Sequence, residues 1–401
     1  MDLPGRPGHR VVVSRGVTTR GMYRNVLALG AVSLLNDAGS EMVIPFLGVF
    51  LATTLGAGAT VLGIVEGLAD AVSSLLKVFA GRWSDRSRRT WAFVFVGYAL
   101  AAGARPFLAL ATAPIHVVLV RVTDRIGKGL RTAPRDALLA ASVPKEVRGT
   151  AFGIHRSMDH AGAIVGPLLA LGVLLWWTED LRVLFACSLV PGLLAVATVL
   201  LFVREGAPHQ AAAERPAAGP NPYPWRLLVP VALSTLGTVG DTFLMLKAGV
   251  TEATPLVGLP LLWIALHVVR FAIAAPGGWL ADRAGALPTV VVGWTWRAIC
   301  LAMLAAVGGQ LATGIAIVGL GLAAVSEPGE KALVAQHVGA DRRGSAFGGY
   351  HGVVGVMALP ASVGFGFLWD HTSAGLAFAA ASALASVATL TLLALLGRHR
   401  S

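Results

Sequence analysis

Long apolar runs separated by short polar segments dominate this sequence and restrict its fold more than any other feature. Breaks at glycine, proline and charge clusters divide the chain into twelve such runs, at 25–53, 59–80, 91–112, 115–140, 147–175, 182–203, 226–249, 256–280, 288–308, 311–338, 345–368 and 373–397. An α-helix needs about 20 apolar residues to cross a bilayer. Only 13% of the residues are charged, against about 25% in soluble domains. We therefore predict an all-α integral membrane protein with twelve transmembrane helices.

The net charge of +11 lies mainly in the short segments between these runs. The cations do not gather on a soluble basic domain, which argues against a nucleic-acid partner. Loops on one side carry arginines such as Arg82, Arg86, Arg204 and Arg343, whereas the opposite loops hold few cations. By the positive-inside rule, we expect a multi-pass protein of the cell inner (plasma) membrane with both termini in the cytoplasm.

Two internal matches divide the chain into similar halves. The segment GRWSDR at 81–86 recurs as GWLADR at 278–283, and 134–153 is echoed by 329–348. Duplicated halves are how alternating-access transporters place a binding site between two bundles. The predicted organisation is a cytoplasmic tail at 1–24, a six-helix bundle at 25–203, a cytoplasmic linker at 204–225, a second six-helix bundle at 226–397 and a cytoplasmic tail at 398–401.

The loop after the second run resembles the loop signature of the major facilitator superfamily, and a weaker copy lies in the matching loop of the second half. The resemblance extends over 25–397 and implies the major facilitator fold, with two pseudo-symmetric six-helix bundles. It also implies a conformational latch, although a plain stop-transfer cluster is the alternative. The latch residues would be Gly81, Asp85, Arg86, Arg89, Asp282 and Arg283.

In the fifth run, Gly162, Gly166 and Pro167 resemble the core of the antiporter signature of the same superfamily. We expect the two glycines to serve close helix packing. The glycine pair that closes the signature is replaced by Ala170 and Leu171. Antiport is therefore favoured by this resemblance without being fixed by it.

The fourth run carries five cations at helical spacing, which places them on one face together with Asp124. They are Arg121, Arg125, Lys128, Arg131 and Arg135. Charges inside a bilayer need a partner or a water-filled cavity. We expect the first three cations to line a substrate cavity and the last two, with Asp136, to form ion pairs near the interface. The remaining candidate cavity residues are Asn36, Asp124 and Arg156.

Asp37 and Glu41 lie four residues apart on one face of the first helix. A poorly solvated carboxylate can load and release protons near neutral pH. We expect these acids to face Arg121 and Arg125 across the cavity and to couple proton movement to transport. Simple neutralisation of a helix-four cation is the alternative. Asp159 in the fifth run is the next candidate for proton coupling.

The sequence lacks a phosphate-binding loop of the Gly-x-x-x-x-Gly-Lys type, paired metal ligands and a nucleophile elbow. We therefore expect a secondary transporter rather than an enzyme, with no cofactor and no metal. Proton-coupled efflux by antiport is the leading hypothesis, proton-coupled uptake of an anionic metabolite is the alternative, and a non-transporting membrane sensor is a remote one. The expected partners are a small-molecule substrate, anionic in the second hypothesis, protons and the lipid bilayer, and the protein is expected to be a monomer.

Overall fold

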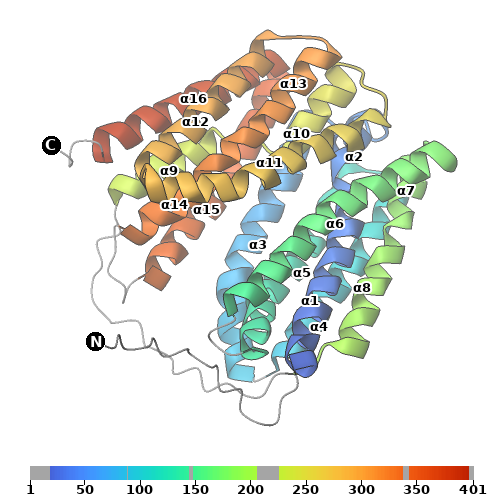
Figure 1. The fold of residues 1–401 in the computed structure, drawn as a ribbon. Coiled ribbons are helices and arrows are strands. Elements are labelled where there is room, and N and C mark those ends of the chain that lie inside the picture. Colours follow the sequence, from blue (N-terminus) through green and yellow to red (C-terminus); the bar gives the residue numbers. More distant parts are fainter. Residues whose placement is uncertain (1–18, 88, 144–147, 206–224, 337–342, 397–401) are drawn as a thin grey trace, which may run out of the picture.

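The computed structural model describes residues 19–87, 89–143, 148–205, 225–336 and 343–396. Every regular element within these ranges is helical (Figure 1). Residues 1–18 of the predicted tail at 1–24, the whole predicted tail at 398–401 and most of the predicted linker lie outside the described residues. The all-α prediction is thus confirmed.

The first half of the chain forms one bundle. Its elements are α1 (Thr19–Glu41), α2 (Ile44–Thr53), α3 (Ala59–Ser87), α4 (Thr90–Ala104), the 3-10 helix η1 (Arg105–Leu110), α5 (Pro114–Ala141), α6 (Arg148–Trp176), α7 (Leu181–Cys187) and α8 (Leu189–Phe202). Within it, α1 packs on α6 and α8, and α4 packs on α5 and α8.

The second half forms a similar bundle. Its elements are α9 (Trp225–Leu236), α10 (Asp241–Leu246), the π-helical turn η3 (Lys247–Thr251), α11 (Gly258–Arg283), α12 (Ala286–Ala306), α13 (Gln310–Leu320), the 3-10 helix η4 (Gly321–Val325), α14 (Ser326–Gln336), α15 (Arg343–His371) and α16 (Ala374–Leu396). Here α9 packs on α15 and α16, and α12 packs on α14 and α16.

Eleven helical stretches of the described chain are long and apolar enough to cross a bilayer. The helix α5 is not among them because charged residues interrupt its apolar sequence. Its 28 residues nevertheless span roughly 42 Å at about 1.5 Å per residue, which suffices for a crossing. With α5 included, the structure has the twelve crossings that the sequence predicts.

Two of the predicted continuous spans are broken near their middle. The first breaks at Met42 and Val43, since Pro45 near the start of α2 has no N–H to continue the helical ladder. The seventh breaks at 237–240, between Gly237 and Gly240, which favour an end to the helix. Broken helices in equivalent positions of two repeats are typical of transporter binding sites.

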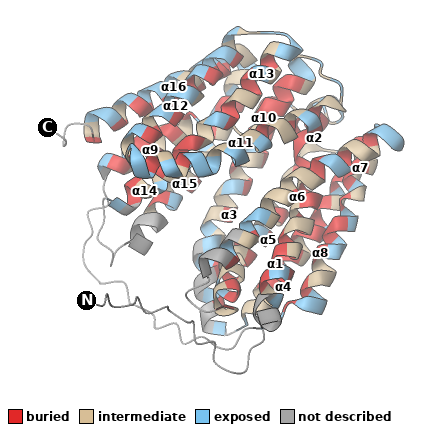
Figure 2. Ribbon diagram, in the orientation of Figure 1, coloured by how far each residue is buried: buried red, intermediate tan, exposed pale blue. Residues whose placement is uncertain are grey.

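Buried residues occur along the helices of both bundles (Figure 2). Within the described residues, the buried hydrophobic side chains form three clusters. One cluster, around Leu29 and Tyr98, belongs to the first bundle alone, and another, around Val290 and Leu392, belongs to the second. Both lie at the end of the molecule where Phe202 and Trp225 border the linker, which we name the linker end. The bundles therefore have separate cores at this end.

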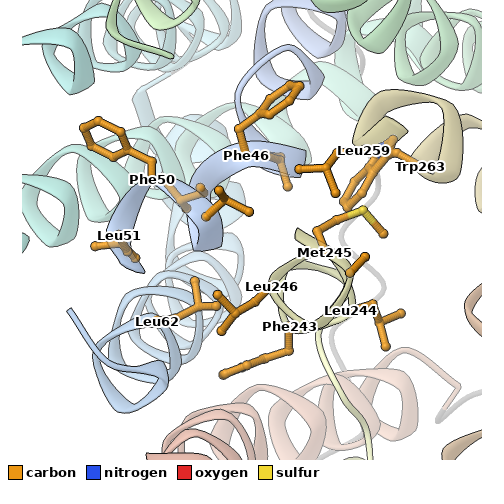
Figure 3. Close-up of a cluster of buried hydrophobic side chains, with 14 of the residues drawn as sticks. Phe46, Phe50, Leu51, Leu62, Phe243, Leu244, Met245, Leu246, Leu259 and Trp263 are labelled. Atoms are coloured by element: carbon orange, nitrogen blue, oxygen red, sulfur yellow. The ribbon is translucent and has the colours of Figure 1, made fainter. Parts of the chain in front are cut away.

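The third cluster joins both bundles at the opposite end, which we name the sealed end. Figure 3 shows Phe46, Phe50 and Leu62 of the first bundle beside Phe243 and Met245 of the second. Burying each such side chain contributes about 1.5–3 kcal/mol relative to exposure to water. The sealed end is therefore closed by a continuous apolar core.

Close helix crossings and a helix cap strengthen the sealed end. A Cβ placed on Gly63 of α3 would meet the backbone oxygen of Ser362 on α15, so only glycine allows this approach. The Asp370 carboxylate, at the end of α15, accepts hydrogen bonds from the backbone N–H groups of Ala59 and Thr60, both at 2.7 Å. A carboxylate at a helix N-terminus satisfies free donors and complements the helix dipole. Asp370 thus joins the second bundle to the start of α3.

Candidate functional site

A cavity of about 590 Å³ lies between the two bundles, and both broken helices contribute to its wall. Glu41 ends α1 beside the first break, and Thr238, Val239 and Gly240 come from the second break. The wall includes Trp263 and Tyr350, which offer aromatic surface. Its acidic residues outnumber its arginines, which are Arg125, Arg270 and Arg297. The acidic residues are Glu41, Glu66, Asp70, Asp241, Glu327 and Glu330.

The two acids of α1 lie directly against the glycines of α6. A Cβ on Gly162 would come within 2.9 Å of the Asp37 Cβ, and one on Gly166 within 2.8 Å of the Glu41 Cβ. The glycines therefore let α6 approach the acidic face of α1 more closely than any other residue would. The structure in this way brings together two sets of residues that the sequence identified separately.

We name the contact between Asp37 and Glu41 of α1 and Gly162 and Gly166 of α6 the seam. Of its two acids, Glu41 faces the cavity. Its Oε2 atom is buried and has no hydrogen-bond partner. Asp37 differs, because its Oδ1 accepts a hydrogen bond from Nδ2 of Asn36 at 2.9 Å. A buried polar atom without a partner is costly, and such atoms often mark a functional site.

Asp159 lies on α6, one turn before Gly162. Its Oδ2 lies 3.7 Å from Nδ1 of His155 and 3.7 Å from Nη1 of Arg156, while its Oδ1 is buried without a hydrogen-bond partner. The Arg156 side chain is 69% exposed and is not part of the cavity wall. Of the three acids predicted for proton coupling, Asp37 and Glu41 thus lie at the contact between α1 and α6, while Asp159 contacts residues of α6 itself.

A chain of buried polar groups runs through the first bundle behind the cavity wall. Nη2 of Arg105 donates to Oδ1 of Asn36 at 2.8 Å, and its Nε donates to Oδ1 of Asp124 at 2.9 Å. Asp124 lies 3.7 Å from Arg121, whose Nη2 donates to Oε1 of Glu66 at 2.8 Å. These contacts link α1, η1, α5 and α3.

Arg105 was not among the residues singled out from the sequence, although it is buried at the centre of this chain of contacts. The available signal was an arginine followed by Pro106 inside an apolar run. An ionisable residue at such a position is expected to have a partner within the protein. Helical spacing along α5 could not reveal that partner, because Arg105 lies on another element.

The expectation that Arg121 faces the acids of α1 across the cavity is corrected by the structure. Its guanidinium is 4% exposed and pairs with Glu66 and Asp124. Asn36 and Asp124 are likewise buried in the first bundle, while Lys128 is exposed. The reason is that Glu66 on α3 lies within reach of Arg121, a contact between helices that spacing within α5 does not contain.

Arg125 is the one member of the predicted cavity set that lines the cavity, and its Nε lies 3.8 Å from Asp70. Arg131 lies over the ring of Tyr98, at 4.5 Å from the ring centroid. Arg135 pairs with Asp136 at 2.9 Å. The cations of α5 therefore contact different neighbours and do not form one positive wall.

The second bundle supplies polar wall residues that lie outside the site predicted from the sequence. Asp241, at the start of α10, accepts a hydrogen bond from Nη2 of Arg270 at 2.7 Å. Arg297 donates to the hydroxyl groups of Ser234 and Thr238. Glu330 and its partners complete this side of the cavity and are described below. Since these residues follow no helical stripe, sequence spacing did not set them apart.

Comparisons with known proteins agree with this architecture. A family model described as Major Facilitator Superfamily matches residues 29–274. An uncharacterised transporter of the same type from Methanocaldococcus jannaschii is 31% identical over 383 residues, covering 93% of this chain and 95% of its own. The chain belongs to the major facilitator superfamily.

More distant relatives add detail about the superfamily. The multidrug resistance protein MdtH of Photorhabdus laumondii is 29% identical over 167 residues, covering 42% of this chain and 40% of its own. A bacterial homologue of the human lysosomal transporter Spinster, in an inward-facing and occupied conformation, has a TM-score of 0.76 at 14% identity, covering 94% and 97% of the two chains. The inward-open xylose transporter XylE of E. coli has a TM-score of 0.72 at 16% identity, covering 94% and 96%. These two structures support the fold alone.

The loop signature of the superfamily lies at the linker end. The helix α3 runs through Gly81, Asp85 and Arg86, while the side chains of Asp85 and Arg86 lie outside what the structure describes. Arg89 is exposed just before α4, and Asp282 is exposed at the end of α11. Arg283 is exposed too, and its guanidinium lies 5.4 Å from the centroid of the Trp279 ring. The latch therefore stays a prediction from the family resemblance.

Proposed function

We propose that this superfamily transporter exports a small molecule from the cell in exchange for protons. The observation that carries the proposal is Glu41, whose carboxylate lines the cavity, lacks a partner for Oε2 and is packed on Gly166 of the antiporter-like sequence. A carboxylate that has no fixed counter-ion can bind a proton on one side of the membrane and release it on the other. Exchange follows when the cavity carries the proton in one direction and the substrate in the opposite direction.

The proposed cycle uses the two ends of the molecule in turn. With the sealed end closed, Glu41 exchanges protons with the linker end while the cavity exchanges substrate with the same end. When the apolar core of the sealed end separates and the linker end closes, the same carboxylate exchanges with the other side. Rocking of two bundles about a central site is the general mechanism of transporters with repeated halves.

The orientation proposed for this cycle places the linker end in the cytoplasm of a cell with the protein in its inner membrane. It rests on the arginine-rich loops, such as the segment at 81–89, and on the rule that such loops stay in the cytoplasm. In this orientation the linker end, where the bundles have separate cores, faces the cytoplasm, and the sealed end faces outward. A cysteine introduced in place of Ser87 should therefore be protected from an impermeant thiol reagent added to intact cells, and labelling from outside would contradict the orientation.

Export is supported further by the MdtH relative, which is described as a multidrug resistance protein. Uptake of an anionic metabolite is the competing function, for which the cations of α5 would argue. Arg121 is engaged by Glu66, and six acidic residues line the cavity against three arginines. An anion without a compensating positive group would therefore meet net repulsion, which favours export over anion uptake.

The direction of proton movement distinguishes the two functions. Purified protein would be reconstituted in liposomes with a pH-sensitive dye trapped inside, and small amines, acids and zwitterions would be added outside. Antiport predicts that an entering substrate makes the lumen more alkaline, whereas symport predicts acidification. The Glu41→Gln variant should lose the pH change, and Glu179→Gln, at an exposed position of the sealed end, is the matched control. A substrate-driven pH change that persists in Glu41→Gln would move the coupling site to another acid, with Asp159 the next candidate.

A further inference from the structure

The second bundle holds two opposite charges that are not paired with each other. Arg297 on α12 and Glu330 on α14 both line the cavity. Neither takes part in an ion pair within 4.0 Å among the described residues. Arg121 and Arg270, by contrast, each contact a carboxylate directly. The two unpaired charges therefore need a separate explanation.

Arg297 is held by neutral oxygen atoms. Its Nη2 donates to Oγ of Ser234 at 2.6 Å, and its Nη1 donates to Oγ1 of Thr238 at 3.1 Å. Its Nε is buried and has no hydrogen-bond partner. A guanidinium has five N–H donors, and hydroxyl groups do not neutralise its charge. The side chain is thus fixed in place while its positive charge and part of its donor capacity stay available.

Glu330 is held by neutral donors in a corresponding way. Its Oε1 accepts hydrogen bonds from Nε1 of Trp294 at 2.7 Å and from Oγ of Ser326 at 3.1 Å. Its Oε2 accepts one from the hydroxyl of Tyr350 at 2.7 Å. Three donors of this kind orient a carboxylate without cancelling its charge. Glu330 therefore presents a fixed negative group at the cavity wall.

Trp294 keeps the two charges apart. The centre of the Arg297 guanidinium lies 5.8 Å from the centroid of the indole ring, while the indole N–H is bonded to Glu330. Trp294 itself is 1% exposed, so it lies behind the wall as a rigid support. Since the indole contacts both charged groups, their separation is set by the protein rather than by their attraction.

We infer that Arg297 and Glu330 form a dipolar subsite that binds a zwitterion, a small molecule with a carboxylate for Arg297 and an amine for Glu330. The inference rests on the proposed transport function and specifies the substrate class of the same cavity. A zwitterion satisfies both charges at once, whereas a simple cation or anion leaves one of them without a partner in a poorly solvated cavity. Cavity volume permits molecules well beyond the size of one amino acid.

The test measures binding to the full-length protein in detergent, which does not depend on proton coupling. Phenylalanine and 4-(aminomethyl)benzoate would each be compared with the matched amine and the matched acid, by the shift in Tm and by calorimetric Kd. We expect at least one zwitterion to bind tenfold or more tightly than both of its matched ions. Equal binding of a matched ion, or the absence of binding by every compound, would overturn the inference.

Neutralising Arg297 or Glu330 should remove the preference for the zwitterion over one of its two matched ions, and that ion differs between the two variants. In Arg297→Gln the matched amine should bind as well as the zwitterion, and in Glu330→Gln the matched acid should do so. Arg297→Lys and Glu330→Asp keep each charge and should retain part of the preference, which covers the case of a variant that fails to fold. Lys331→Gln, at an exposed neighbouring position, should bind like the unmodified protein. Failure of the proposed antiport would instead appear as normal zwitterion binding without any proton movement.

Discussion

The two halves of this transporter descend from one plan but differ in what they place on the cavity wall. At the offset of 197 residues that relates 81–86 to 278–283, Asp37 and Glu41 of α1 correspond to Ser234 and Thr238. The first half therefore has two acids where the second has two hydroxyls, and these hydroxyls bind Arg297. The comparison suggests a division of labour, with proton exchange in the first half and recognition of substrate in the second.

The helices that support these positions differ as well. At the offset of 195 residues, Gly162 and Gly166 of α6 correspond to Met357 and Ala361 of α15. Glycine lets α6 press against the acids of α1, and no such approach is built into α15 at these positions. The first half therefore has a close contact between the acids of α1 and the glycines of α6. The second half has a more open polar wall at the corresponding positions.

The largest effect should follow from breaking the buried ion pairs of the first half. Arg105→Ala leaves Asp124 buried without its nearest cation, and removing one partner of a buried pair costs about 3–5 kcal/mol. Unfolding of the purified variant in detergent, followed by Tm, should show this loss. Arg297→Ala in the second half removes bonds to two hydroxyls and a contact with the Trp294 ring but breaks no ion pair, and it should cost clearly less. Equal losses in the two variants would contradict the contrast between the halves.

A smaller effect is expected at the seam between α1 and α6. Gly166→Ala would bring a Cβ to 2.4 Å from the backbone oxygen of Ala38, and overpacking of this kind costs about 1–3 kcal/mol. Because the added methyl also displaces Glu41, proton exchange should fall while zwitterion binding is retained. Gly172→Ala on the same helix is the matched control, since its Cβ would meet only the Trp176 ring at 3.3 Å or more. Unchanged proton movement in Gly166→Ala would show that the close approach has no functional importance.

The smallest effect concerns the Asp370 cap, which supplements the apolar core between the halves at the sealed end. Asp370→Ala removes a helix cap from α3, and loss of such a cap costs about 0.5–2 kcal/mol. The cap exists only while the sealed end is closed, so the variant should favour the opposite state. Spin labels would be attached at the exposed positions Thr53 and Thr372 of a protein in which Cys187 and Cys300 are replaced. A larger fraction of the variant molecules should show a longer distance between the two labels. Asp370→Asn retains a hydrogen-bond acceptor and should therefore show a smaller population with the longer distance than Asp370→Ala.

The sequence was sufficient to predict most of the fold, because apolar length and internal duplication are properties of the chain itself. It did not give the breaks in the first and seventh crossings, which depend on Pro45, Gly237 and Gly240 within otherwise apolar runs. Helical spacing identified the acids of α1 and the glycines of α6 as two separate sets, and the structure shows that the two sets lie together.

The partners of the charged residues were harder to predict. Spacing along α5 gives the direction of Arg121 around its own helix but not the identity of the neighbour, and that neighbour is Glu66 on α3. Glu330 lies in the segment that echoes 134–153, but neither Glu330 nor Arg297 belongs to a helical stripe of charges, and their importance emerges only from their contacts with Trp294. Contacts between helices are set by tertiary packing, which a single sequence does not display.

The division of labour between the halves is tested most directly by measuring proton exchange and substrate binding on the same two variants. A pH step applied to proteoliposomes on a solid-supported membrane reports charge movement without any substrate, and the shift in Tm with a bound zwitterion reports recognition. We predict that Glu41→Gln loses the pH-step current and keeps the Tm shift, whereas Glu330→Gln keeps the current and loses the Tm shift. If each variant lost both signals, or if Glu41→Gln kept its current, the assignment of proton exchange to the first half and of recognition to the second would be contradicted.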